Sequence, residues 1–285
     1  MNRILAISVL FPVGIYAQSP FHLNLFGGFS NYTGDLQSKR FTLDQSYGAF
    51  GIGGQYDFTN HISFLTGFNF GQVGASDKYN KPTLQARNLS FQTKIFEWNA
   101  MVEYDLFDLS DHRFTPYGFV GLAIFHFNPY AYDTLGNRVY LRPLSTEGEG
   151  LPQYPNNKEY SLTQFAIPFG LGIKLRVTSN VTLSYEVSFR KLFTDYLDDV
   201  SNRYVDEATL LADRGPVAVE MAYRGNEIKN GAPYPAAGTL RGNPKYDDWY
   251  YFSGIRVSIG FGGGYSGESS SRYGKTRLDC PKKVY

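Results

Sequence analysis

Hydrophobic and polar residues alternate with a period of two along most of this 285-residue chain, which is the pattern of β-strands. In the clearest example, Phe165, Ile167, Phe169, Leu171 and Ile173 alternate with small or charged residues. Eight segments carry the pattern: 21–30, 46–58, 61–74, 91–107, 114–127, 161–178, 181–194 and 248–262. The sequence therefore predicts an all-β chain of eight strands.

Alternation alone fits either a soluble sandwich or a membrane barrel that turns its apolar face to lipid. Segments of about ten residues or longer suit tilted membrane-spanning strands, because soluble strands are mostly about five or six residues long. The polar faces are rich in Gly, Ser and Asn with charges of both signs, as a narrow lumen requires. Aromatic residues at segment ends are typical of the girdles at membrane interfaces: Phe58, Trp98, Tyr104, Tyr117, Phe193, Tyr196, Trp249, Tyr250 and Tyr251. We therefore expect an eight-stranded antiparallel transmembrane β-barrel.

The connections alternate strictly between short and long. The short ones are 59–60, 108–113 and 179–180, and the long ones are about 31–45, 75–90, 128–160 and 195–247. This alternation is typical of outer-membrane barrels, which have short periplasmic turns and long outer loops. An even number of strands then places both termini in the periplasm.

The N-terminus predicts export. Asn2 and Arg3 precede an almost wholly apolar stretch, 4–16, and Ala17 ends it, which is the pattern of a secretory signal peptide cleaved after residue 17. We therefore expect three parts: a signal peptide at 1–17, an outer-membrane β-barrel at 18–262 and a flexible periplasmic tail at 263–285.

Composition excludes several classes of protein. Lys plus Arg total 27 and Asp plus Glu total 26, so nothing in the net charge of +1 favours nucleic acid as a partner. No apolar run after the N-terminus reaches the roughly 18 residues of a membrane-spanning helix, which excludes a helical membrane protein. One Cys excludes an internal disulfide framework and a Cys-rich zinc site.

Charged residues on the polar faces of the strands should line the lumen. They are Glu97, Glu103, Asp105, Glu186, Lys174, Arg176, Arg190 and Arg256. Side chains just fill the interior of an eight-stranded barrel, and isolated charges in such an interior are costly. We expect these four acids and four bases to form a paired network that closes the lumen and carries no solute.

The sequence contains no recognisable catalytic or metal-binding motif. Its four histidines, His22, His61, His112 and His126, lie in different segments without HExxH spacing or a nearby Cys. The acids Asp195, Asp198 and Asp199 begin the last long loop without the spacing of an EF-hand, so we interpret them as solvated loop acids. We expect no enzymatic activity, no cofactor, no metal and no small-molecule substrate.

The tail differs from the barrel. A Gly/Ser-rich stretch, 262–271, predicts a flexible linker. It leads to a basic segment with the only cysteine of the chain: Arg272, Lys275, Arg277, Cys280, Lys282 and Lys283. A lone Cys in an oxidising compartment is typical of an intermolecular bridge or a free thiol. The tail is either a docking segment for a periplasmic partner or a disordered end whose charges face anionic lipid.

Four stretches resemble one family of small outer-membrane barrels. They are FHFNP at 125–129, RPLSTEGEG at 142–150, YSL with QFAIPFGLG at 160–172, and FTDYLDDVS at 193–201. The most specific block, 160–201, is similar to the family of the PorG subunit of the type IX secretion system. The resemblance implies an OmpA-like barrel that is not an enzyme and that ties a periplasmic ring of PorK and PorN subunits to the outer membrane.

Two other functions compete with this interpretation. A generic small barrel would support the envelope or bind surface ligands through its loops. A lipid-modifying barrel enzyme would need a nucleophile and a base near one membrane face, and no such pair is recognisable. Co-purification of ring subunits with the native protein would favour the secretion role, and an isolated barrel would favour the generic one.

Overall fold

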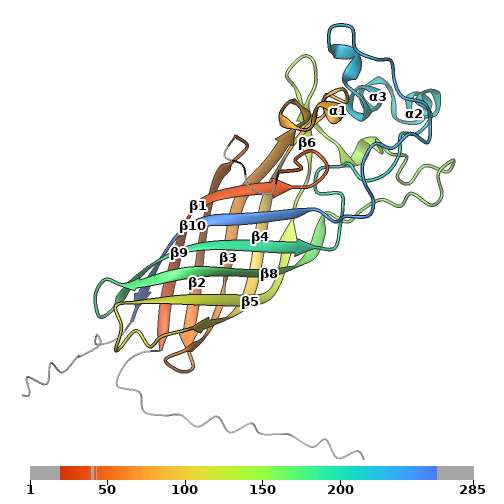
Figure 1. Cartoon of the computed structure of the whole chain (residues 1–285). Coiled ribbons are helices and arrows are strands. Elements are labelled where there is room, and N and C mark those ends of the chain that lie inside the picture. The colour runs from red at the N-terminus through yellow and green to blue at the C-terminus, as the bar shows by residue number, and fades with distance from the viewer. Residues whose placement is uncertain (1–19, 40–41, 43, 262–285) are drawn as a thin grey trace, which may run out of the picture.

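A computed structural model describes residues 20–39, 42 and 44–261, and its centre is a closed barrel of eight antiparallel strands (Figure 1). Each strand pairs with its neighbour in the chain, and β1 pairs with β10 to close the ring. The strands are β1 (Phe21–Thr33), β2 (Tyr47–Asp57), β3 (Ile62–Ser76), β4 (Ser90–Asp105), β5 (Phe114–His126), β8 (Thr163–Arg176), β9 (Val181–Leu192) and β10 (Trp249–Gly260). The predicted eight-stranded antiparallel fold is confirmed.

Short turns join the strands at one end of the barrel, the turn end, and long connections join them at the other, the loop end (Figure 1). The turns are 58–61, 106–113 and 177–180. The first residue of β1 and the last residue of β10 also lie at the turn end. Within the described residues, no helix is long and apolar enough to cross a membrane.

Apolar side chains cover the outside of the barrel. On β8, Phe165, Leu171 and Ile173 are 66%, 72% and 58% exposed, whereas Lys174 on the other face is buried. This apolar exterior, the lipid belt, also includes exposed rings at the turn end, where Phe21 packs edge-on against Tyr56 and Tyr56 against Phe58. An apolar exterior around a polar interior is the arrangement of a barrel in lipid.

Two of the predicted girdle aromatics face the wrong way for that role. Tyr117 and Tyr250 are 3% and 0% exposed because their side chains point into the lumen, where both donate hydrogen bonds to carboxylates. Tyr196 is also not in a girdle, since its ring stacks 4.8 Å from that of Tyr160 among the loops. Position near a segment end did not reveal which face each ring occupies.

Glycines allow the barrel to close at its seam. Gly28 of β1 and Gly254 of β10 are register partners, and a Cβ on either residue would strike the backbone of the other strand. Gly53 and Gly67 meet in the same way between β2 and β3. Strand glycines that permit such close approach are typical of tight bends in small barrels.

The described parts of the four long connections fold together over the loop end and form a single structure, the loop cap, made of 34–39, 42, 44–46, 77–89, 127–162 and 193–248 (Figure 1). It contains a hairpin, β6 (Tyr130–Tyr132) and β7 (Arg138–Tyr140), joined to β4 through the pair Gln92–Tyr130. Its helices are α1 (Pro82–Gln85), α2 (Glu207–Arg214) and α3 (Pro216–Ala222), with 3₁₀ turns at Asp77–Tyr79, Arg142–Leu144 and Gly225–Glu227.

Local signals define the two longer helices. Asp206 caps α2 by accepting a hydrogen bond from the Thr209 amide at 2.9 Å, and Gly215 ends it with a φ of 83°. Pro216 then starts α3 at its first position, where a missing N–H costs nothing. These helices bury Leu210 and Ala218 in a second apolar core, separate from the core that fills the loop end of the barrel.

Replacing Leu171 by Arg should destabilise the inserted barrel by about 2–4 kcal/mol, because Leu171 lies near the middle of β8 in the lipid belt. Leu135→Arg is the matched control, since Leu135 is 86% exposed at the tip of the β6–β7 hairpin. Urea unfolding in lipid vesicles measures both. Equal stability of the two variants would show that β8 faces water.

Candidate functional site: a closed lumen under a loop cap

An ion pair closes the lumen towards the loop end. Arg190 of β9 donates two hydrogen bonds to Glu97 of β4, Nε to Oε2 at 2.8 Å and Nη2 to Oε1 at 2.8 Å. Glu97 also accepts hydrogen bonds from the Tyr250 hydroxyl at 2.7 Å and the Asn69 amide at 3.0 Å. The guanidinium lies 4.3 Å from the centre of the Phe252 ring. Both charges are almost fully buried, and Arg190, Tyr250 and Asn69 reach Glu97 from three different strands, so this contact ties the barrel wall together across its interior.

A second group of charges lies nearer the turn end. Lys174 of β8 contacts both Glu103 and Asp105 of β4, with 2.7 Å between Nζ and Asp105 Oδ2. Arg256 of β10 pairs with Glu103 and, at 3.3 Å, with Glu186 of β9. Tyr117 donates a hydrogen bond to Glu186 at 2.8 Å. All of these charged residues are buried. Arg256 contacts Glu103 from the opposite side of the eight-strand ring, and Lys174 contacts it from β8, two strands away from β4.

The structure thus brings together seven of the eight charged residues that the sequence placed in the lumen. The eighth, Arg176, lies half-buried at the turn end of β8 and donates a hydrogen bond to the Ser110 carbonyl at 3.1 Å. The tail residues Arg272, Lys275, Arg277, Cys280, Lys282 and Lys283 lie outside the described residues, as does the predicted signal peptide at 1–17.

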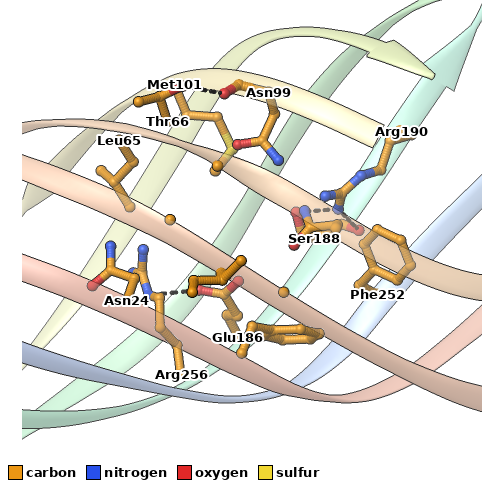
Figure 2. A pocket seen from close by; sticks show the side chains of 16 residues that line it. Asn24, Leu65, Thr66, Asn99, Met101, Glu186, Ser188, Arg190, Phe252 and Arg256 are labelled. Carbon is orange, nitrogen blue, oxygen red and sulfur yellow. Dashed lines mark hydrogen bonds and ion pairs between the residues drawn. The ribbon is translucent and has the colours of Figure 1, made fainter. Parts of the chain in front are cut away.

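Little space remains between the two charged groups. A cavity of about 50 Å³ is lined by Arg190 from the first group, by Glu186 and Arg256 from the second, and by Met101 and Phe252 (Figure 2). That volume has room for only a few water molecules. The buried ion pairs and this small cavity favour a lumen filled by its own side chains.

Aromatic residues fill the loop end of the lumen. Phe125 and Phe127 lie with ring centres 5.4 Å apart, and Phe125 packs edge-on against Tyr250. Together with Tyr32 and Phe91 they are 2% exposed or less. The sequence led us to expect only small and charged residues inside the barrel. The strands instead continue past the lipid belt into the loop cap, where their inner faces form an ordinary apolar core.

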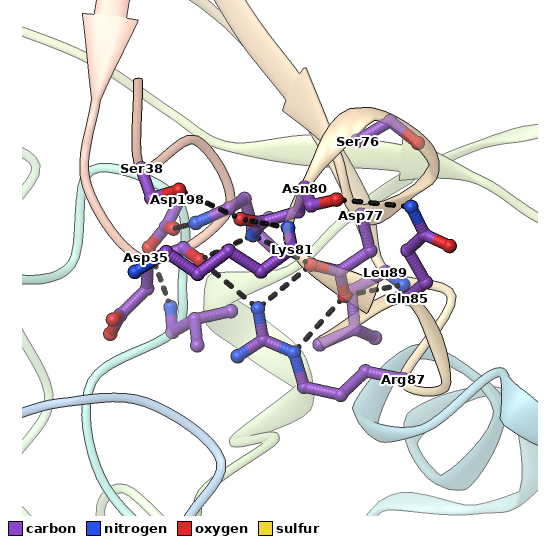
Figure 3. Close-up of polar contacts among 12 residues, drawn as sticks. Asp35, Ser38, Ser76, Asp77, Asn80, Lys81, Gln85, Arg87, Leu89 and Asp198 are labelled. Carbon is purple, nitrogen blue, oxygen red and sulfur yellow. Dashed lines mark hydrogen bonds and ion pairs between the residues drawn. The ribbon is translucent and has the colours of Figure 1, made fainter. Parts of the chain in front are cut away.

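Buried charges also hold the loops of the cap to one another. Arg87 forms a bidentate ion pair with Asp77, in which Nε donates to Oδ2 at 3.1 Å and Nη2 donates to Oδ1 at 2.8 Å (Figure 3). Its Nη2 also donates to the backbone carbonyl of Asp35 at 3.0 Å. It also donates to the carbonyl of Arg241. One guanidinium therefore joins the first, second and fourth long connections.

Arg241 joins the remaining connection. It donates to Glu147 Oε1 at 3.0 Å and to the carbonyls of Asp199 and Ala222. Glu147 in turn accepts hydrogen bonds from the amides of Ser201 and Asn202 at 3.0 and 2.8 Å. Since Glu147 and Arg241 are both almost fully buried, the third and fourth connections behave as one packed unit.

The loop acids are not solvated, which corrects the sequence-based interpretation. Asp198 and Asp199 are each 1% exposed, and Asp195 is 9% exposed. Asp199 accepts hydrogen bonds from Thr146 and Tyr160 at 2.6 and 2.7 Å. These two partners of Asp199 lie more than 30 residues away in the chain, so local spacing could not have revealed its burial.

One hydroxyl bridges two of the buried acids. The Tyr32 oxygen lies 2.6 Å from Asp198 Oδ2 and 2.9 Å from Asp248 Oδ1. A hydroxyl has one hydrogen, so the second contact needs a hydrogen on a carboxyl. Burial and the charge of Asp35 raise the pKa of Asp198 well above its usual range. Burial and the charge of Asp198 raise the pKa of Asp248 in the same way, which agrees with a proton shared in this cluster.

Two further acids are held neutral in the cap. Burial raises the pKa of Glu149 to about 8, with the charges of Asp199 and Glu147 adding to the effect. Burial and the charge of Asp198 raise the pKa of Asp195 to about 9. Among residues 20–39, 42 and 44–261, no group of three His, Cys, Asp or Glu side chains is arranged to hold a metal ion. Glu149 and Asp195 are thus buried acids whose environment favours the protonated form.

Breaking the ion pair between Glu97 and Arg190 should be costly. Arg190→Met leaves the Glu97 carboxylate buried without its cation, and we expect a loss of about 3–5 kcal/mol of unfolding free energy. The double variant Glu97→Leu/Arg190→Met should recover most of that loss, because no buried charge remains. Urea unfolding in vesicles measures all three proteins.

The control for this cycle is Lys191→Met. Lys191 lies at the loop end of β9, partly exposed, and its Nζ is 2.5 Å from Asp247 Oδ2. Such a pair is worth about 1 kcal/mol or less. If Arg190→Met costs no more than Lys191→Met, the lumen is hydrated and the pair does not hold the barrel.

The loop cap should loosen in alkaline solution. Glu149 and Asp195 have a raised pKa in the folded cap, whereas in the unfolded chain they ionise near about pH 4. Their contribution to stability is therefore complete below about pH 4 and is lost as the pH rises through about 8 to 9. Limited proteolysis of 127–162 and 193–248 should accelerate between about pH 7 and 10, after correction for protease activity on an unfolded substrate.

The matched variant is Glu149→Gln/Asp195→Asn, whose side chains stay neutral throughout that range. The rate at which its cap is cleaved should rise less with pH than that of the native protein. An unchanged pH dependence in this variant would assign the loosening to other groups.

Comparison with solved structures finds several small barrels of low similarity. Neisserial surface protein A is 12% identical, with 86% of this chain and 100% of that chain covered and a TM-score of 0.43. Ail of Yersinia pestis in complex with the heparin analogue sucrose octasulfate is 10% identical, with 85% and 97% covered and a TM-score of 0.40. The outer membrane protein OprG of Pseudomonas aeruginosa is 11% identical, with 86% and 98% covered and a TM-score of 0.40. At these values no functional statement passes from those proteins to this chain.

No curated protein matches the chain in sequence. A family model described as "Domain of unknown function (DUF6089)" matches residues 2–211, which is well over half of the chain. The protein is therefore a member of the DUF6089 family.

Proposed function

We propose that this protein is a non-enzymatic outer-membrane barrel that serves as a membrane anchor in type IX protein secretion and not as a conduit. The closed lumen is the observation that carries the proposal. Arg190 reaches Glu97 and Arg256 reaches Glu103 across the lumen, and Lys174 adds a further contact to Glu103. The cavity lined by Arg190 and Arg256 is only about 50 Å³. A barrel closed in this way offers its two ends and its outer surface for function, but no channel.

The orientation follows from the loops. Short turns at one end and long connections at the other are typical of outer-membrane barrels whose turns face the periplasm. We infer that the loop cap lies outside the cell and the turn end in the periplasm. Under this orientation both β1 and β10 lead to the periplasmic side, where a secretion ring of PorK- and PorN-like subunits would lie.

The likeness to the PorG family supports the secretion role from a separate direction. The block 142–150 supplies Glu147, and the most specific block, 160–201, supplies Tyr160 and Asp199, all of which hold the loop cap together. The shared residues thus account for the cap, and docking to the ring is assigned to the basic tail. There Arg272, Lys275, Arg277, Lys282 and Lys283 would attract an acidic partner, and Cys280 would pack or cross-link against it.

A generic small barrel that binds ligands at the cell surface is the second candidate function. The packed loop cap favours it, because four connections held by Arg87 and Arg241 form a preorganised outer surface. This alternative predicts an isolated barrel on purification, with no periplasmic partner.

The purified protein should show no stable conductance in planar bilayers. Buried ion pairs and packed aromatic rings leave no aqueous path, so current should stay at the level of the protein-free bilayer. A porin recorded in the same bilayers is the positive control. A reproducible ion-selective current from the pure protein would overturn the closed-lumen proposal.

Deleting residues 263–285 should leave the barrel folded, because β10 ends at Gly260. The truncated protein should still shift on gels on heating, as folded barrels do, but should no longer co-purify ring subunits. Cys280→Ser alone separates the thiol from the charges, and any higher-mass band on non-reducing gels should disappear in that variant. Wild-type recovery of the ring by the truncated barrel would place docking in the short turns instead.

A further inference from the structure

The outward face of β3 and β4 changes character sharply towards the loop end. Phe70 and Phe96 are register partners in the lipid belt, with ring centres 4.7 Å apart. The next outward-facing pair on the same two strands is Gln72 and Lys94. Two residues advance about 7 Å along a strand. Lys94 therefore stands just beyond the apolar band, at the level of the lipid headgroups.

The β6–β7 hairpin extends this polar face. Tyr130 donates a hydrogen bond to Gln92 at 3.0 Å, and Gln72 donates to the same amide oxygen at 3.2 Å. The guanidinium of Arg138 lies 4.5 Å from the centre of the Tyr130 ring. The rings of Tyr132 and Tyr140 each lie about 6 Å from the ring of Tyr130. Tyr132 is 40% exposed and Tyr140 is 45% exposed. These contacts hold Arg138 in one place on a platform of tyrosines.

Two cations of this face lack a carboxylate partner. Lys94 and Arg138 are exposed, and within the described residues neither forms an ion pair with an acid. The acid in the hairpin, Asp133, is already used by Asn137, which donates to it from its backbone at 2.7 Å and its side chain at 2.9 Å. By contrast, Lys191 at the loop end of β9 is paired with Asp247. The charge on the first face is thus available to an anion.

We propose that the tyrosine–cation patch formed by Lys94, Tyr130, Tyr132, Arg138 and Tyr140 binds the phosphorylated sugar headgroup of a glycolipid in the membrane leaflet at the loop end. The patch continues the lipid belt, so its neighbour in the membrane is a headgroup. The fork of Arg138 matches phosphate oxygens, and Lys94 adds a second charge on the side nearer the lipid belt. The exposed rings and hydroxyls of Tyr132 and Tyr140 suit a sugar more than a small phospholipid headgroup.

The test is native mass spectrometry of the whole protein with bis-phosphorylated lipid A, and with the same glycolipid after removal of both phosphates. The native protein should retain the phosphorylated form preferentially. Lys94→Gln/Arg138→Gln should weaken its binding roughly twenty-five-fold, or about fivefold for each cation at a membrane surface. The preference for the phosphorylated form should disappear with it.

Lys191→Gln is the matched control, since it removes a cation near the same height that already has an acidic partner. It should bind the glycolipid as the native protein does. Both proteins should shift on gels on heating like the native barrel, because all three positions lie on the outer surface.

Three results would overturn the proposal. The double variant could bind lipid A as tightly as the native protein, or the native protein could retain both forms of the glycolipid equally. Inorganic phosphate could displace lipid A at millimolar concentration while the dephosphorylated glycolipid fails to bind, which would make the patch a simple phosphate site.

Discussion

The structure depends on the electrostatics of a narrow interior. Eight strands enclose a lumen that side chains fill, so a charge inside it has almost no water and must find an opposite charge across the barrel. Arg190 meets Glu97 in this way, and Lys174 and Arg256 share Glu103. Because the partners stand on different strands, each contact fixes how the strands are placed around the ring. Closure of the lumen and rigidity of the wall are two results of the same constraint.

The barrel could be predicted because its signals are local. Period-two alternation marked all eight strands, and the charged positions on the polar faces marked the lumen. The pairing of acids with bases could not be predicted, since it depends on the stagger of the closed sheet. Tyr117 and Tyr250 were assigned to the wrong face because proximity to a strand end does not define the direction of a ring.

The loop cap escaped prediction for a different reason. Its residues follow no period, and its contacts join distant parts of the chain: Tyr32 reaches Asp198, and Arg87 reaches the carbonyl of Arg241. Asp195, Asp198 and Asp199 have the composition of a solvated loop, and only the folded cap removes them from water. Several of these acids then need a proton, which links the order of the cap to pH. The inner faces of the strands carry the same apolar core from barrel to cap, so the anchor proposed here is rigid from the membrane outward.

The most direct test of this account is solid-state NMR of the protein in lipid bilayers, measuring dipolar couplings between Lys174 Nζ and the carboxyl carbons of Glu103 and Asp105. The account predicts that both carboxylates lie in direct contact with the ammonium group and that its protons exchange slowly with water. A Lys174 side chain that shows strong contacts to water and no coupling to either carboxylate would contradict the central claim that the lumen is closed by its own charges.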